Sequence, residues 1–274
     1  MRFRPDNLLG APLVGARGSY VVRQLVSSGA FAHVVTAEGP AGLVAIKVLR
    51  PELLHDPEMI ARLEREAALA DLVRHEGVVR VIEGVVREGP FVFFVTEHLE
   101  GCEVAHLLSR RVGVAPPRAV RIIAGAARAL LATHERGLVH RDVKPENLFL
   151  EHASDGGERV KLLDFGAACE RLGTAPAGTP GYASPEQVAG APADFPADVY
   201  ALGVVFHELL HGRRPGSPPR GRELASNPRA PSADVAVLLQ RMLATAAAVR
   251  PTAGEVVAAL SGAPQGSDRS VTPG

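Results

Sequence analysis

The stretch HRDVKPENLFL, residues 140–150, places an imidazole, a carboxylate, an ammonium group and an amide in one short segment before an apolar run. Five fixed identities at these spacings (His, Arg, Asp, Lys and Asn) would arise by chance in about one chain of this length in 10⁴. Chance is therefore a poor explanation, and the segment is interpreted as a functional motif.

On the N-terminal side of this motif the sequence predicts a small antiparallel sheet. Valine and isoleucine recur in short runs separated by turn residues, which is typical of strands. The triplet DPE at residues 56–58 has the N-cap acid and the first-turn proline of a helix start, so a helix is expected from there to about Arg74. The expected strands are residues 20–26, 33–38, 43–49, 78–86 and 91–99.

After Gly101 the pattern changes to helices. Residues 116–137 form an amphipathic run with proline at its start and Gly137 at its end, and further helices are expected in residues 232–260. Residues 212–231 are rich in proline, glycine and arginine and are expected to be irregular. The predicted fold is therefore α+β and bilobal, with a small antiparallel β-sheet N-lobe carrying one main helix, a larger helical C-lobe, and a cleft between them.

The predicted domain organisation has three parts. Residues 1–18 are expected to be an N-terminal extension, residues 19–261 the folded domain, and residues 262–274 a flexible tail of small and polar residues. Within the domain, the N-lobe is placed at about residues 19–97 and the C-lobe at about residues 102–261. A chain of 274 residues has ample material for two lobes of this kind.

Composition excludes several classes of function. The 30 Lys and Arg residues balance the 30 Asp and Glu residues, so no bulk charge favours nucleic acid or an anionic membrane. Cys102 and Cys169 lie far apart, without the spacing of a zinc site, and are expected to be reduced thiols. No apolar run reaches membrane-spanning length, and the first residues lack the apolar core of a signal peptide. A soluble, cytoplasmic domain is predicted, and its oligomeric state stays open.

Six motifs occur in a fixed order and carry a family resemblance: VAIKVL, HRDVKPEN, DFG, GTPGYASPE, DVYALG and VRPT. Over roughly residues 20–260 the chain resembles the protein kinase family, and specifically the eukaryotic-like serine/threonine kinases of bacteria. The resemblance implies ATP as the phosphoryl donor and Mg²⁺ as the metal, with Mn²⁺ as an alternative. It also implies that Asp142 orients or deprotonates the incoming hydroxyl, that Lys144 steadies the γ-phosphate, and that Asn147 and Asp164 bind the metal.

Lys47 and its partner can also be argued from the residues themselves. Both faces of the strand LVAIKVL are apolar, so the ammonium group of Lys47 is expected to face inward and to need a carboxylate. On the following helix, steps of 100° place Glu66 inside the apolar arc, whereas Glu58 and Glu64 lie outside it. An ion pair between Lys47 and Glu66 is predicted, and the family position agrees.

The stretch VSSGAFAHVV, residues 26–35, resembles the family's phosphate-binding loop with two of its three glycines replaced. Gly29 keeps the central position, Ser27 stands at the first and Ala32 at the third, which predicts weakened ATP affinity. Phe31 is expected at the tip of this flap. The remaining nucleotide contacts implied by the resemblance are Val26, Val34, Ala45, Thr96, Glu97 and Leu99.

Other motif residues are expected to support the site. His140 is predicted to brace the catalytic loop. Asp198 opens an apolar helix, so it is either a simple N-cap or, by resemblance, a tether for the same loop. Glu186 and Arg250 match a family ion pair that joins distant elements.

The segment GTPGYASPE favours a protein substrate, because it resembles the family's platform for an extended peptide. Lys144 together with Thr179, which is expected to lie near Asp142, fits the serine/threonine branch. By resemblance Arg141 receives a phosphate from the activation segment, and Thr174 is the better candidate for that modification.

Two alternatives remain open from the sequence. A pseudokinase or scaffold would bind ATP without efficient transfer, and it would be marked by loss of Lys47, Asp142, Asn147 or Asp164, all of which are present. A small-molecule phosphotransferase would share the base and the metal ligands but would not need the peptide platform.

Overall fold

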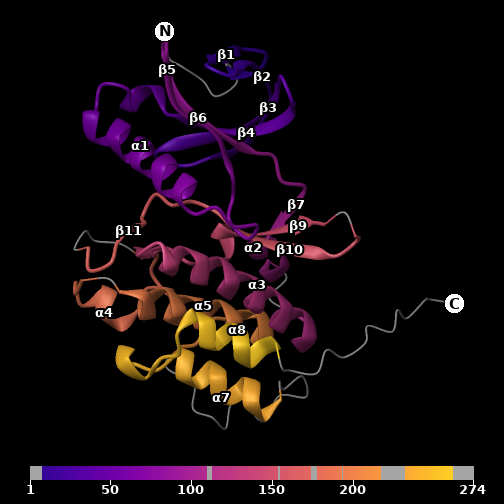
Figure 1. Cartoon of the computed structure of the whole chain (residues 1–274), viewed down its shortest axis with the longest axis vertical. Helices are drawn as coiled ribbons and strands as arrows, with labels where there is room; N and C mark the ends of the chain where they lie inside the picture. Colours follow the sequence, from indigo (N-terminus) through magenta and orange to yellow (C-terminus); the bar gives the residue numbers. More distant parts are fainter. Residues whose placement is uncertain are drawn as a thin grey trace, which may run out of the picture.

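The structure is a computed structural model that describes residues 8–109, 113–153, 155–173, 178–192, 194–216 and 232–261. A β-rich N-lobe lies above a larger, mainly helical C-lobe, and the chain between β6 and β7 connects them (Figure 1). This is the bilobal α+β organisation predicted from the sequence. The predicted tail and most of the predicted irregular stretch, residues 217–231, fall outside the described residues.

The N-lobe sheet is antiparallel throughout, with the strand order β1-β2-β3-β4-β6-β5. Val44, Ile46 and Val48 of β4 are buried in the lobe core, which confirms that they share one face of the strand. The strands are β1 (Pro12–Gly15), β2 (Gly18–Ser28), β3 (Ala32–Gly39), β4 (Gly42–Leu49), β5 (Val81–Glu88) and β6 (Phe91–Glu97).

The first strand differs from the sequence prediction, which treated residues 1–18 as an extension. In the described part, β1 pairs with β2, and Leu13 is fully buried in the N-lobe core together with Leu8. The buried carboxylate of Glu83 on β5 accepts hydrogen bonds from the Ala16 amide (2.5 Å) and from the Tyr20 hydroxyl (2.6 Å). Burial and this carboxylate raise the pKa of Tyr20 to about 12. Residues 8–18 are therefore part of the N-lobe.

Helix α1 (Pro57–Leu72) is the main N-lobe helix and starts as predicted. The Asp56 side chain caps it by accepting from the amides of Glu58 and Met59. The helix ends at Leu72, just before the predicted end. Its inner face, which includes Leu63 and Ala67, packs on Val92 and Phe94 of β6. This packing fixes the rotation of the helix and hence the direction of its buried polar residues.

The C-lobe combines helices with two small sheets. Its upper sheet has the order β10-β9-β7, and β8 pairs with β11. The strands are β7 (Gly101–Glu103), β8 (Leu138–Val139), β9 (Leu148–His152), β10 (Glu158–Leu162) and β11 (Cys169–Glu170). The helices are α2 (Val104–Leu108), α3 (Pro116–Glu135), α4 (Pro185–Val188), α5 (Phe195–His211), α7 (Ala233–Met242) and α8 (Ala253–Ser261).

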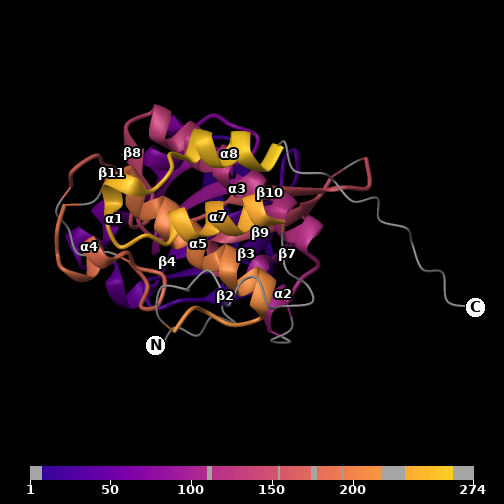
Figure 2. The same cartoon turned by 90° about the horizontal axis from the view of Figure 1, so that it is seen from below.

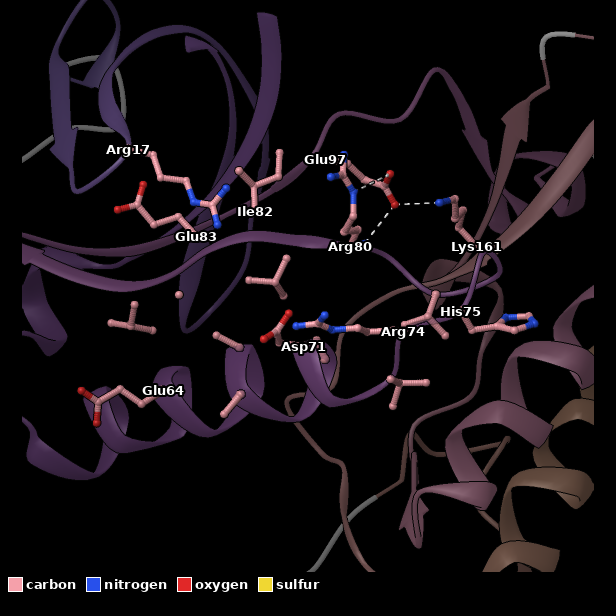
Figure 3. Close-up of a pocket in the computed structure, with 18 of the residues that line it drawn as sticks. Arg17, Glu64, Asp71, Arg74, His75, Arg80, Ile82, Glu83, Glu97 and Lys161 are labelled. Atoms are coloured by element: carbon pink, nitrogen blue, oxygen red, sulfur yellow. Dashed lines mark hydrogen bonds and ion pairs between the residues drawn. The ribbon is translucent and has the colours of Figure 1, made fainter. Parts of the chain in front are cut away.

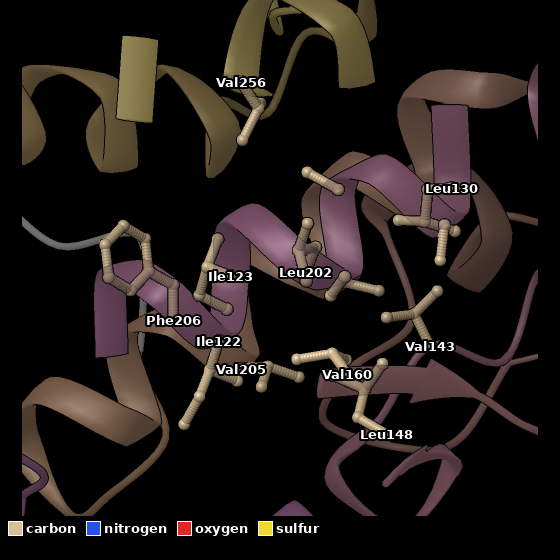
Figure 4. Close-up of a cluster of buried hydrophobic side chains, with 14 of the residues drawn as sticks. Ile122, Ile123, Leu130, Val143, Leu148, Val160, Leu202, Val205, Phe206 and Val256 are labelled. Atoms are coloured by element: carbon tan, nitrogen blue, oxygen red, sulfur yellow. The ribbon is translucent and has the colours of Figure 1, made fainter. Parts of the chain in front are cut away.

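The C-lobe core is organised around α3 and α5. Ile122, Ile123 and Leu130 of α3 meet Leu202 and other apolar residues of α5 (Figure 4). Helix α5 is apolar around most of its circumference, as expected for a helix enclosed by others. Helices α7 and α8 lie on the side of the C-lobe away from the N-lobe (Figures 1 and 2). The segment of residues 140–150 thus lies between this helical core and the N-lobe.

His207 in α5 gives the domain a predicted pH dependence of stability. Burial, with a contribution from His211, lowers the pKa of His207 from 6.5 to about 4. The unfolded chain therefore binds the proton more readily, and the contribution of neutral His207 is present above pH 6.5 and is lost as the pH falls towards 4. We expect His207→Gln to flatten this part of the curve of unfolding free energy against pH, measured by urea denaturation. The exposed His55→Gln serves as the control, and equal curves for both variants would contradict the prediction.

Candidate functional site

A cleft of about 690 Å³ lies between the lobes and contains most of the predicted site residues. Strands of the N-lobe form its roof, and the catalytic loop with β9 forms its floor. Ten of the predicted nucleotide-contacting or metal-binding residues line it: Val26, Ser27, Val34, Ala45, Lys47, Thr96, Glu97, Leu99, Asn147 and Asp164.

The predicted ion pair between Lys47 and Glu66 is present. Lys47 Nζ on β4 lies 2.5 Å from Glu66 Oε1 on α1, and it lies 3.4 Å from Asp164 Oδ2 on the cleft floor. Glu66 is 3% exposed. One ammonium group therefore connects the sheet, the helix and the C-lobe.

Burial and charge act in opposite directions on this cluster. Burial alone would lower the pKa of Lys47, but the carboxylates of Glu66 and Asp164 outweigh it and raise that pKa. Burial also opposes ionisation of Asp164, yet Lys47 and the Gly166 amide hold its pKa below the usual value. Lys47 is thus a firmly charged cation in the cleft.

The catalytic loop concentrates polar contacts on Asp142. Lys144 Nζ donates to Asp142 Oδ2 (2.6 Å) and to Thr179 Oγ1 (3.1 Å), while the Thr179 hydroxyl donates to Asp142 Oδ1 (2.6 Å). The Asn147 amide donates to the Asp142 main-chain carbonyl (2.8 Å) and to Oδ2 (3.1 Å). Both carboxylate oxygens of Asp142 thus accept hydrogen bonds from neighbouring side chains, which hold the carboxylate in one orientation.

The loop itself is tied to the C-lobe core through Asp198. This carboxylate is fully buried and accepts from the main-chain amides of His140 (2.8 Å) and Arg141 (2.7 Å). His134 completes the set at 2.9 Å. The reading of Asp198 as a simple N-cap is wrong, because Asp194 caps α5 and Asp198 lies inside its first turn. The tether, the other expectation, agrees with these contacts.

His140 and Arg141 occupy constrained positions beside Asp142. His140 is fully buried, its Nε2 lies 2.9 Å from the Leu163 carbonyl, and its ring meets Phe165 edge-on. Arg141 is 5% exposed and has a φ of 68°, in the left-handed region that is costly for a residue with a Cβ atom. Its Nε is buried and has no hydrogen-bond partner among the described residues. Thr174, the residue whose phosphate Arg141 is predicted to bind, lies outside the described residues.

The donor set of the cleft fits a hard divalent cation. Because Nδ2 of Asn147 is used within the loop, its Oδ1 is available as a ligand, and the Asp164 carboxylate is 43% exposed on the same floor. Over the described residues no group of three acidic, histidine or cysteine side chains forms a metal site. Two oxygen ligands, completed by phosphates and water, are the usual arrangement for Mg²⁺ rather than a cage of protein ligands.

Glu186 and Arg250 form the predicted long-range pair. Arg250 is bidentate to Glu186, at 2.6 and 2.8 Å, and its side chain is fully buried. The guanidinium also donates to the main-chain carbonyls of Ala244, Pro196 and Thr245. The pair joins α4, which follows the segment GTPGYA, to the loop before α8.

Two predicted nucleotide contacts, Gly29 and Phe31, do not line the cleft. The turn that they form is closed by a hydrogen bond from the Gly29 amide to the Ala32 carbonyl (2.9 Å). The ring of Phe31 instead packs with the apolar cluster between β4, β6 and α1. The assignment of Phe31 as a cleft residue is therefore corrected by the structure, and the reason is that this turn points its side chain towards α1.

Several cleft residues were not predicted. Thr36, Phe149, Glu103 and Leu163 also line the cavity. Thr36 lies two positions after Val34 on β3, so the period of two along a strand would have found it, whereas Asn147 precedes β9 and gives no such signal for Phe149. Glu103 follows the interlobe connection, and burial together with Glu146 raises its pKa. No local pattern marks it.

The carboxylate of Glu97, a residue that also lines the cleft, is hydrogen-bonded to two residues outside the cleft lining. Lys161 Nζ on β10 donates to it at 2.7 Å, and the Arg80 amide donates at 2.9 Å (Figure 3). These contacts border another cavity, of about 870 Å³, between α1 and β5. Glu97 therefore links the start of β5, the connection and the C-lobe sheet behind the site.

Within the described residues, no helix combines the length and the apolar character needed to cross a membrane.

Comparisons with known proteins agree with one another. A sequence profile described as "Protein kinase domain" matches residues 20–260. The chain is 35% identical over 208 residues to serine/threonine-protein kinase pkn3 of Myxococcus xanthus, covering 72% of this chain and 38% of that protein. It is 38% identical over 212 residues to serine/threonine-protein kinase PkaB of Streptomyces coelicolor, covering 74% and 50%. The chain thus spans half or less of these curated relatives.

Among solved structures, the kinase domain of Mycobacterium tuberculosis PknI is similar, with a TM-score of 0.70 and 30% sequence identity. The match covers 91% of this chain and 97% of that domain. Sequence and fold comparisons therefore point to one family.

Proposed function

The chain belongs to the protein kinase family, and on that premise we propose that it is a serine/threonine protein kinase domain that transfers the γ-phosphate of ATP to protein hydroxyls. The observation that carries the proposal is the convergence of Lys47, Asp142, Asn147 and Asp164 around one cleft. Phosphoryl transfer is mostly a matter of positioning and charge stabilisation, and these four groups are the ones it requires.

In the proposed reaction, Asp142 orients the substrate hydroxyl and accepts its proton as the oxygen bonds to the γ-phosphorus. The bond from that phosphorus to the β–γ bridging oxygen breaks, and ADP leaves with the electron pair. Lys144, 2.6 Å from Asp142, is placed to neutralise charge on the transferred group. Lys47, held by Glu66, is placed to bind the phosphates that stay with ADP.

Asn147 and Asp164 are the residues that would hold Mg²⁺, with Mn²⁺ as an alternative. When bound, such a cation neutralises phosphate charge. What this chain supplies is orientation, because Asn147 is fixed by its bonds to Asp142 and Asp164 by its contacts with Lys47 and Gly166.

The proposed substrate is a serine or threonine in a protein. The Thr179 contacts with Asp142 and Lys144 and the anchoring of the following segment by Glu186 and Arg250 support it. The test is transfer of labelled γ-phosphate from Mg-ATP to the chain itself and to a basic protein. ATP binding without transfer would favour the scaffold, and transfer to small metabolites alone would favour the small-molecule enzyme. A cytoplasmic location, where ATP is present, also remains a prediction.

Phosphorylation of Thr174 is proposed as an activating step. Arg141 supports this, because its guanidinium is nearly buried beside the catalytic loop and its Nε lacks a partner among the described residues. We expect Thr174→Ala to lower activity about 10- to 100-fold, since one charge-assisted contact is worth about 1.5–3 kcal/mol. Phosphopeptide mapping with steady-state kinetics checks it. Full activity of Thr174→Ala, with modification confined to other segments, would refute the step.

A further inference from the structure

The tip of the loop between β2 and β3 is fastened to the N-lobe rather than suspended over the cleft. The Phe31 carbonyl accepts a hydrogen bond from the Arg50 amide at the end of β4 (3.1 Å), and the Gly29 amide closes the turn on Ala32. The Phe31 ring packs against the apolar cluster that includes Leu63 and Ala67 of α1, and it lies under the guanidinium of Arg62 on the same helix. The loop therefore touches the helix that carries Glu66.

The same ring lies close to two cations. The Arg62 guanidinium carbon is 4.9 Å from the ring centroid, and Lys47 Nζ is 5.8 Å from it. Both distances are within the range in which the ring face attracts a cation. Arg62 precedes Glu66 by four residues, so both lie on one face of α1. Phe31 thus contacts Arg50 through its carbonyl and Lys47 through its ring. Its ring also contacts α1, the helix that carries Glu66, the partner of Lys47.

We propose that Phe31 is a positioning residue that couples the β2–β3 loop to α1, so that nucleotide binding under the loop and the Lys47–Glu66 pair favour each other. The proposal rests on the proposed kinase function and adds to it a device outside the cleft. Such a coupling is reciprocal: nucleotide that holds the loop down holds α1 in place, and displacement of α1 loosens the loop. Of the three positions that are glycine in the family pattern, only Gly29 is glycine here, and Ser27 and Ala32 occupy the other two. The contact of Phe31 with α1 would restrict this loop further.

A purely apolar role for Phe31 predicts different behaviour. Leucine would fill most of the same space against this apolar cluster but would present no ring face to Arg62. Phe31→Leu therefore separates packing from coupling, and Phe31→Tyr keeps the ring face. Arg65→Ala is a matched control for Arg62→Ala, because Arg65 is an exposed arginine of the same helix without a ring contact among the described residues.

The experiment is a double-mutant cycle of Phe31→Leu with Arg62→Ala, beside the same cycle with Arg65→Ala. The dissociation constant of ATP is measured by calorimetry, and kcat and KM are measured with a peptide substrate. We expect Phe31→Leu to raise the dissociation constant about fivefold and to lower kcat severalfold. The factor by which Arg62→Ala raises the dissociation constant of ATP should be about three times smaller in the Phe31→Leu background than in the unchanged protein. This is the scale of one cation–π contact.

Phe31→Tyr is expected to keep most of the coupling with Arg62, because tyrosine retains the ring face. Independent effects of Phe31→Leu and Arg62→Ala, equal to those in the Arg65→Ala cycle, would overturn the proposal. A change in melting temperature with unaltered kcat, KM and ATP affinity would also overturn it, because it would show a packing role alone. The binding cycle does not require transfer, so failure of the kinase function would be seen separately, as ATP binding without product.

Discussion

Replacing Asp142 with asparagine is expected to lower kcat by about 10³, because a positioned general base contributes about 10²–10⁴ to such a step. Asparagine keeps the size of the side chain but cannot accept a proton from the substrate hydroxyl. It also removes the negative partner of Lys144, which is 2.6 Å away. ATP affinity should change little, since Asp142 is not among the residues that line the cleft cavity. Labelled-phosphate transfer measures the first effect and calorimetry the second.

Asp155→Asn is the matched control. Asp155 is an exposed turn residue of the C-lobe whose Oδ1 accepts from the Gly157 amide, a contact that asparagine can reproduce. Its kcat should equal that of the unchanged protein. If Asp142→Asn transferred phosphate as fast as the unchanged protein, the base role would be rejected. If the unchanged protein itself failed to transfer, the scaffold alternative would gain support.

Arg250→Met is expected to produce the largest loss of stability, about 3–5 kcal/mol, because removing one member of a buried ion pair leaves its partner uncompensated. Arg250 is fully buried, and its loss would leave the Glu186 carboxylate and three main-chain carbonyls without their donor. It also removes the guanidinium from the face of Tyr200, 4.9 Å away. The midpoint and slope of urea denaturation, followed by circular dichroism, give the change in unfolding free energy.

Arg171→Met provides a control with similar geometry and a different environment. Arg171 is also bidentate, to Asp194 at 2.8 and 3.0 Å, but it lies at the surface. Exposed pairs contribute little, so this midpoint should stay within error of the original. Similar losses in the two variants would contradict the argument from burial. Glu186→Gln, which keeps hydrogen-bonding capacity, should lose less than Arg250→Met.

Local patterns were sufficient to predict the centre of the site. The Lys47–Glu66 pair followed from the period of two on one strand and the 100° step on one helix, because both side chains take their direction from their own element. The catalytic loop was readable since its groups lie within one segment. The five strands predicted between residues 20 and 99 were likewise marked by their valine and isoleucine runs, although β5 begins at Val81 rather than at residue 78.

Features that depend on long-range packing were not predictable in the same way. The direction of Phe31 is set by a turn closed on Ala32 and by Arg50, a residue of another strand. The position of Asp198 inside α5 depends on Asp194 taking the capping role. The four-residue strand β1 is too short for its alternation to be recognised in sequence, and its pairing with β2 becomes clear only in three dimensions.

That short strand bears on where the smallest self-sufficient folding unit begins. The region shared with the kinase family starts at Tyr20, yet the Glu83 carboxylate accepts a hydrogen bond from the Ala16 amide, and Leu8 and Leu13 are fully buried in the N-lobe core. A chain trimmed to the shared region would keep every residue of the chemistry while exposing a carboxylate and an apolar hollow behind the sheet. We therefore expect the folding unit of this chain to begin upstream of Tyr20, where the match to the family starts.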